Sequence, residues 1–154
     1  TIILKSSNQY ADGGSGDDTI DASAATRARL IGGDGNDTLI GNTSAVDEFA
    51  LAVATGFDTI TNFLQANQGT PLARDLLVID LSNFGLGTTF DAAELVSAAG
   101  GAAVGTSAQF IYDETTHDLW YDVDGTLAVH AAVKLAHFNA APAHLTLGDF
   151  GTLL

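Results

Sequence analysis

The sequence predicts a mostly β fold: a short parallel β-roll over residues 1–62, capped by a C-terminal α+β or β-sandwich-like unit over residues 63–154. Three observations predict it. Two nonapeptides share one Gly/Asp pattern, and a third copy of this pattern is degenerate. Near residue 62 the composition changes from Gly/Asp turns to ordinary apolar runs. Repeats that alternate a turn with a short strand are typical of stacked parallel coils.

The two clear repeats are Gly13–Asp21 and Gly32–Ile40, which lie 19 residues apart. Both fit G-G-x-G-x-D-x-U-x, where U is a large apolar residue. One nonapeptide supplies a six-residue turn and a three-residue strand, and two complete a coil, so like turns stack about 18 residues apart. The segment Gly56–Ile60 keeps only the end of the motif. We therefore expect three acidic turns on one side of the roll.

These turns carry the oxygen ligands that a hard divalent cation prefers. Glycine adopts φ > 0 easily, so several carbonyl oxygens can point to one place, and the motif aspartate adds a negative oxygen. Gly/Asp-rich stretches also form ordinary turns or flexible linkers. Two nearly complete copies in similar coil phase favour calcium binding, with two ions between three turns as the natural count.

The turns on the opposite side of the roll are expected within Ala22–Ile31 and Gly41–Phe49. The first of them has Arg27 and Ala28 where a carboxylate is needed, although Asp21 lies just before it. We predict that this side holds less calcium, or none.

The charge of the chain connects folding with cations. Nineteen acidic residues face five Lys and Arg, for a net charge of −14. Self-repulsion opposes compaction without counter-ions, so folding and metal binding should form one equilibrium. Such acidity argues against nucleic acid or an anionic membrane as a partner. No apolar run approaches the length of a membrane span, so no stable membrane insertion is expected.

The elements of the roll follow from the repeats. Short strands are expected around Thr19–Asp21, Arg29–Ile31, Thr38–Ile40, Glu48–Leu51 and Thr59–Thr61. One large apolar residue from each should stack in a thin core, formed by Ile20, Leu30, Leu39, Phe49 and Ile60.

The C-terminal unit has a different composition, with apolar runs in place of Gly/Asp turns. Asp75–Leu81 is an apolar run typical of a buried strand. Thr89 can cap a helix over about Asp91–Ala99. Strands are expected at Gln109–Tyr112 and Leu119–Tyr121 around a turn, then at Thr126–Leu135, with Leu145–Leu147 and Phe150 closing the chain. This unit should cover the exposed end of the roll.

Together these segments resemble the C-terminal region of RTX (repeat-in-toxin) proteins exported by type I secretion. The resemblance is carried by the repeats of Gly13–Ile40, by Gly56–Phe63, by Leu77–Ser82 and by the tail Phe110–Phe150. It implies Ca²⁺ as the cofactor, held by Asp18 and Asp37, more weakly by Asp58, and by turn carbonyls. The candidate metal-binding residues are Gly13, Gly14, Ser15, Gly16, Asp18, Gly32, Gly33, Asp34, Gly35, Asp37, Gly56 and Asp58.

The resemblance also implies a function. The chain would be the calcium-dependent folding and secretion module of a larger extracellular bacterial protein, with Thr1 at the edge of a longer polypeptide. Its uncleaved C-terminal region would be read by the type I secretion machinery. Any catalytic activity would belong to an upstream domain.

Two other classes of function compete with this one. A binding module for polysaccharide or a cell surface could use Trp120 and its neighbours, because exposed aromatic rings can stack on sugars. An enzyme is favoured least: no HExxH motif, nucleophile elbow or other catalytic constellation appears, and we assign no catalytic residue. The four histidines are expected to be structural or exposed.

Overall fold

The computed structural model describes residues 1–51, 56–65, 74–87, 89–127, 129–139 and 142–152. In these residues the protein is mostly β, with two sheets, three single 3-10 turns and no α-helix. No helix in this described part is long and apolar enough to cross a bilayer.

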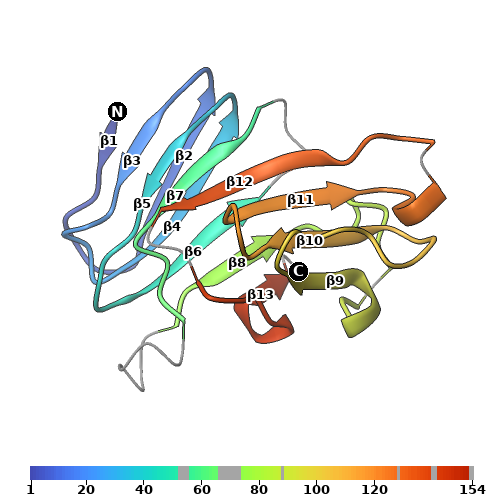
Figure 1. The fold of residues 1–154 in the computed structure, drawn as a ribbon. Helices are drawn as coiled ribbons and strands as arrows, with labels where there is room; N and C mark the ends of the chain where they lie inside the picture. The colour runs from blue at the N-terminus through green and yellow to red at the C-terminus, as the bar shows by residue number, and fades with distance from the viewer. Residues whose placement is uncertain (52–55, 66–73, 88, 128, 140–141, 153–154) are drawn as a thin grey trace.

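Residues 1–51 and 56–62 contain parallel strands that alternate between the two sheets and form a coil (Figure 1). The first sheet receives β1 (Ile2–Ile3), β3 (Thr19–Asp21), β5 (Thr38–Ile40) and β7 (Asp58–Thr61). The second receives β2 (Gln9–Ser15), β4 (Arg27–Asp34) and β6 (Val46–Leu51). Each expected strand of the roll is confirmed within a strand of the structure.

The register of the coil follows the spacing of the repeats. In the first sheet Ile20 lies beside Leu39, and Leu39 lies beside Ile60. In the second sheet Leu30 lies beside Phe49. All five side chains are fully buried, which confirms the predicted core. Because a strand presents alternate residues to each face, the same register places polar residues on the outer faces of both sheets.

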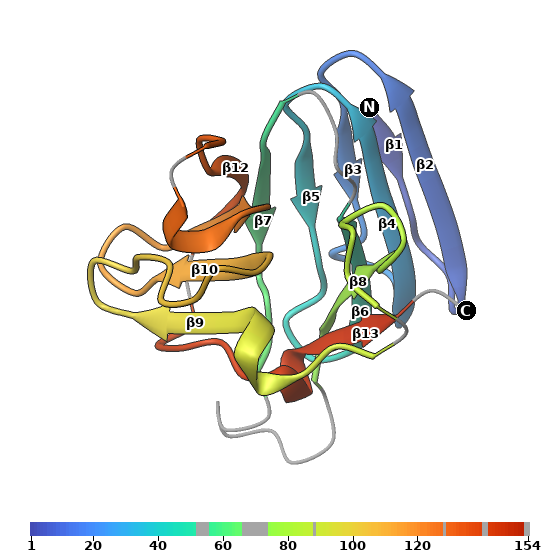
Figure 2. The same cartoon turned by 90° about the vertical axis from the view of Figure 1, so that its right-hand side faces the viewer.

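Both sheets continue beyond residue 62 (Figure 2). The first sheet adds β12 (Val133–Asn139) in parallel to β7, then β11 (Asp118–Asp122), β10 (Gln109–Asp113) and β9 (Leu95–Ala98). The second adds β8 (Leu76–Ile79) and β13 (Phe150–Thr152). The division of the chain at residue 62 stays a prediction, since strands on both sides of it share the same sheets.

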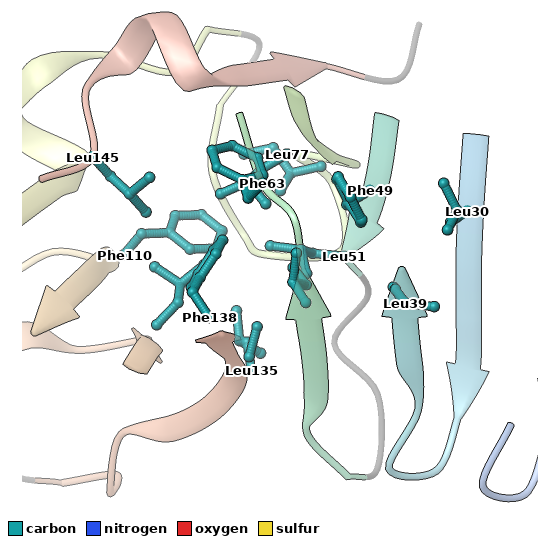
Figure 3. Close-up of a cluster of buried hydrophobic side chains, with 14 of the residues drawn as sticks. Leu30, Leu39, Phe49, Leu51, Phe63, Leu77, Phe110, Leu135, Phe138 and Leu145 are labelled. Carbon is teal, nitrogen blue, oxygen red and sulfur yellow. The ribbon is translucent and has the colours of Figure 1, made fainter. Parts of the chain in front are cut away.

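Aromatic rings join the coil to the C-terminal strands (Figure 3). The ring centroid of Phe63 lies 5.8 Å from that of Phe49 and 5.3 Å from that of Phe138. Tyr112 packs edge-on against Phe138, and its hydroxyl donates to the carbonyl of Pro142. One hydrophobic cluster therefore runs from the coil into the C-terminal part.

The helix expected over Asp91–Ala99 is wrong. The structure has a single 3-10 turn, Ala92–Glu94, followed by strand β9. Asp91 and Glu94 form a capping box that satisfies the N–H groups of this turn, and β9 then pairs in parallel with β10. Tertiary pairing at a sheet edge has overridden a weak local helix preference. The α+β character expected of the C-terminal unit is corrected to mostly β in the described residues.

The strand expected over Thr126–Leu135 begins later than predicted. Gly125–Leu127 form a 3-10 turn, and β12 starts at Val133. The carboxylate of Asp124 accepts hydrogen bonds from the N–H groups of Val129 and His130, so this stretch is tied to the preceding turn instead of to the sheet.

Candidate metal centre

Two Gly/Asp turns lie directly on top of each other at one side of the coil. In the register of β2 and β4, Gly14 lies beside Gly33 and Ser15 beside Asp34. The N–H of Gly16 donates to the carbonyl of Asp34 at 2.7 Å. The sequence-predicted turns are therefore brought together by the main chain, while the Ser15 and Asp34 side chains face solvent.

Glycine is required in these turns for two reasons. Gly33 and Gly35 have φ of 103° and 132°, in the region that disfavours side chains. A Cβ at Gly35 would also lie 2.6 Å from the carbonyl oxygen of Gly16, and one at Gly33 would overlap the carbonyl of Gly14. Gly56 packs against the carbonyl of Gly35 in the same way, so the degenerate third motif still stacks on the second turn.

The motif aspartates form a ladder from one coil to the next. The N–H of Asp18 donates to Oδ1 of Asp37 at 2.7 Å, and the N–H of Asp37 donates to Oδ1 of Asp58 at 3.1 Å. The carboxylates of Asp37 and Asp58 therefore each accept a hydrogen bond from the preceding turn of the stack. The predicted sites Asp18, Asp37 and Asp58 lie along one line at this side of the coil.

The second carboxylate oxygen of Asp37 is the feature that fits a cation best. Asp37 is 1% exposed, and its Oδ2 is buried without a hydrogen-bond partner among the described residues. Oδ2 points toward Gly32 of its own turn, where a Cβ would overlap it. An unsatisfied buried carboxylate oxygen is costly, and a cation beside it removes that cost. In the described residues the only other such atom is Oδ1 of Asp124, which lies in the C-terminal part.

This donor set matches calcium by chemistry. In the described part of the chain no group of three or more acidic or histidine side chains gathers as a metal site would. Each turn instead places one motif carboxylate against the main chain of the stacked turns, and Ca²⁺ accepts carboxylate oxygens together with carbonyl oxygens. Asp18 is more open, with 24% of its side chain exposed.

The electrostatics of the stack disfavour a full set of negative charges. Burial raises the pKa of Asp58 to about 7, and the neighbouring Asp37 carboxylate pushes this pKa in the same direction. The hydrogen bond from the Asp37 N–H opposes both effects. At neutral pH the ladder therefore favours uptake of a proton or of another cation.

The opposite side of the coil has the same kind of aspartate ladder, but there backbone N–H groups donate to both oxygens of each carboxylate. Asp47 is fully buried, and its two oxygens accept from the N–H groups of Ala28 and Asn42, at 2.8 and 2.7 Å. Asp75 is also fully buried and accepts from the N–H groups of Asp47 and Leu64, at 2.7 and 2.8 Å. Both oxygens of each carboxylate are thus engaged, which favours the predicted sidedness.

The sequence analysis missed the structural role of Asp47 and Asp75. Asp47 was placed within an opposite turn and Asp75 at the start of a strand. The signal that could have found Asp47 is register, because Ala28 and Asp47 lie beside each other in the second sheet, with the same 19-residue spacing that separates Asp18 from Asp37. Asp75 follows Asp47 by 28 residues, so the repeat spacing does not predict its role.

Trp120, the residue considered for sugar stacking, is partly covered. The ammonium group of Lys134 lies 5.5 Å from the centroid of the Trp120 ring and 4.8 Å from that of Phe57. Lys134 also pairs with Asp118 at 2.8 Å, and the opposite oxygen of Asp118 lies 2.8 Å from Nδ1 of His137. These contacts give Trp120 and His137 packing and pairing roles.

Comparisons with known proteins do not extend this picture. A scan against protein-family models, a search of curated proteins and a search of solved structures each found no match. The site is therefore argued from the residues of this chain.

Two buried aspartates provide a matched test of the site. We expect Asp37→Asn to bind fewer calcium ions at saturation, by about one, because it removes the charge of the unpartnered oxygen. Asp47→Asn should keep the ion count and lower the melting temperature in saturating calcium, because its amide presents N–H to the N–H of Asn42. Equilibrium dialysis with metal analysis measures the count. Equal loss of ions in both variants would contradict the sidedness.

The raised pKa values predict how the calcium-free fold responds to pH. Asp58 and Asp75 both have a pKa of about 7 in the folded chain, raised first by burial. In the unfolded chain an aspartate titrates near about 3.9. The folded state therefore binds more protons between these values, and its free energy of unfolding should fall as pH rises from about 5 to about 7. Circular dichroism in EDTA at several pH values measures this as the folded fraction, which should fall toward the largely unfolded chain expected at neutral pH. A stability that rises with pH across this range would contradict the prediction.

Proposed function

We propose that this chain is a calcium-dependent folding and secretion module of the RTX kind, which folds outside the cell as a calcium-loaded parallel β-roll. The observation that carries the proposal is the buried, unpartnered Oδ2 of Asp37, which faces the glycine cradle of its own turn. The stacked turns, the aspartate ladder and the net charge of −14 support it.

In this proposal, folding of the chain depends on a bound cation. Closing the coil brings the carboxylates of Asp18, Asp37 and Asp58 onto neighbouring rungs, where burial and mutual repulsion oppose ionisation. Ca²⁺, when bound, supplies the positive charge that offsets this repulsion. The turn carbonyls and these carboxylates would hold it. On the opposite side, burial and the Asp47 carboxylate likewise raise the pKa of Asp75 to about 7, but there backbone N–H groups engage both oxygens of Asp47 and of Asp75.

Conditional folding suits export through a narrow channel. Extracellular calcium modules bind with dissociation constants of about 10⁻⁴ to 10⁻³ M, so such a site stays empty in a cytosol that holds far less calcium. An acidic chain without its counter-ion remains unfolded and can be threaded. Outside, calcium stabilises the folded form by mass action and hinders return. The expected partners are calcium and the type I secretion machinery.

The folding step is tested by circular dichroism. In EDTA at neutral pH we expect the spectrum of a largely unfolded chain, and in millimolar calcium that of a β protein, because binding and folding share one equilibrium. Millimolar magnesium serves as a control for general charge screening, since Mg²⁺ requires a more regular ligand geometry than Ca²⁺. Identical, folded spectra in EDTA and calcium would remove the switch.

The export step needs a separate readout. A reporter protein joined before Thr1 should appear in the culture medium of bacteria that express a type I exporter, and should remain inside cells whose exporter has an inactive ATPase. Immunoblotting of medium and cells measures the partition. Retention of the reporter with each of several active exporters, despite calcium-dependent folding of the purified chain, would remove the secretion role and leave the calcium role intact.

A further inference from the structure

An open pocket lies on the outer face of the second sheet, away from the stacked acidic turns. It has a volume of about 270 Å³. Three neighbouring strands supply it: Tyr10 from β2, Arg27 and Arg29 from β4, and Glu48 from β6. The register places Tyr10 beside Arg29 and Arg29 beside Glu48, so these side chains form one row across the sheet. Figure 2 shows β2 and β4 side by side at the end of this sheet.

The pocket is positive in a strongly negative protein. Two of the five Lys and Arg residues of the chain meet here, and the single carboxylate of Glu48 lies between them. Arg29 donates from Nε to Glu48 at 2.6 Å, and Arg27 donates to the other oxygen at 3.1 Å. Burial favours protonation of Glu48, but Arg29 and Arg27 outweigh it and lower the pKa of Glu48. The residues that line the pocket therefore carry one positive charge in excess, and the carboxylate of Asp12 lies beside the pocket, at the Tyr10 hydroxyl.

The donors and the ring of the pocket remain accessible. The side chain of Arg27 is 57% exposed and, within the described residues, donates only to Glu48. A guanidinium group has five N–H donors arranged to bind a carboxylate in a bidentate manner. Tyr10 is 60% exposed and presents an aromatic ring beside Arg29, while its hydroxyl donates to Oδ2 of Asp12 at 3.3 Å.

The position of this pocket separates it from the calcium turns. The strands β2 and β4 end in the acidic turns, whereas Arg27 begins β4 at the opposite edge of the coil. The amide oxygen of Gln9, which also lines the pocket, accepts from the N–H groups of Lys5 and Ser6 at 2.6 Å and holds the neighbouring loop. A ligand here can be negative without facing the carboxylates of the turns.

We propose that this pocket binds an acidic oligosaccharide made of uronic acid units. A sugar ring packs on the exposed face of Tyr10, while the carboxylate of the sugar accepts hydrogen bonds from Arg27 and competes with Glu48 for Arg29. The pocket is open to solvent and its lining comes from three neighbouring strands, which suits a polymer chain lying across β2, β4 and β6. This inference concerns a different face from the calcium site and does not require export.

The test is isothermal titration calorimetry of the full chain in saturating calcium, with hexagalacturonate as the probe. We expect binding of hexagalacturonate and no binding of the neutral cellohexaose. Poly-glutamate, which has carboxylates without sugar rings, should bind at least about tenfold more weakly, because it cannot stack on Tyr10. Equal affinity for hexagalacturonate and poly-glutamate would overturn sugar recognition, and absence of binding to hexagalacturonate would overturn the proposal as a whole.

Three variants assign the binding to the pocket. Arg27→Gln should weaken binding about tenfold, because it removes a charged hydrogen-bond donor. Tyr10→Ala should weaken it by a similar factor. Glu48→Gln should tighten binding, because it removes the carboxylate that competes with the ligand. Lys134→Gln is the matched control: it deletes one positive charge on the first sheet and should leave the affinity unchanged.

Calcium can bridge uronate chains to acidic surfaces, so the variants also separate that route from the pocket. Bridging through the acidic turns would leave the affinities of Arg27→Gln and Tyr10→Ala at the wild-type value, and this result would overturn the assignment. Circular dichroism of each variant in calcium shows whether the fold is kept. Should Glu48→Gln unfold, the decision rests on Arg27→Gln and Tyr10→Ala, whose side chains are exposed.

Discussion

The structure depends on a hydrogen bond between coils: a backbone N–H of one turn donates to an aspartate of the next. This contact recurs at both sides of the coil, from Asp18 to Asp37 and from Ala28 to Asp47. It fixes the register of successive coils, but it also places a carboxylate in the interior and uses only one of its oxygens. The two sides of the coil differ in whether a protein donor satisfies the second carboxylate oxygen. At Asp47 it is the N–H of Asn42, and at Asp37 no described donor is present.

The C-terminal strands end the repetition of the coil and share its core. A stack of parallel strands can add further coils without limit, and its last strand leaves unpaired backbone groups. Here β12 pairs in parallel with β7, and β11 then runs antiparallel to β12, so the first sheet changes from stacked coils to a hairpin. The Phe63 ring lies between Phe49 of the coil and Phe138 of β12. Formation of the last coils is thereby coupled to packing of the C-terminal part.

The coil was predictable because its pattern is local and periodic. Glycines, aspartates and single apolar residues at fixed spacing predicted strands such as Thr38–Ile40 and the core residue Leu39, both confirmed. The Asp91–Ala99 segment was not predictable, because its strand depends on pairing with β10. The row of Tyr10, Arg29 and Glu48 was not predicted, although the sequence contains the spacing that produces it. Its members are each 19 residues apart, so the repeat spacing applied to the second sheet would have found it.

The placement of the positive charges leaves the acidic turns without a cationic side chain. Arg27 and Arg29 are engaged by Glu48, and Lys134 is engaged by Asp118, on the outer faces of the two sheets. Among the described residues, no Lys or Arg side chain lies within ion-pair distance of the motif aspartate Asp18. Asp37 and Asp58 have no such partner there. Cationic side chains therefore do not neutralise the centre of the ladder, and this is the physical ground for the proposed calcium requirement, since a proton or a metal ion can supply the missing positive charge.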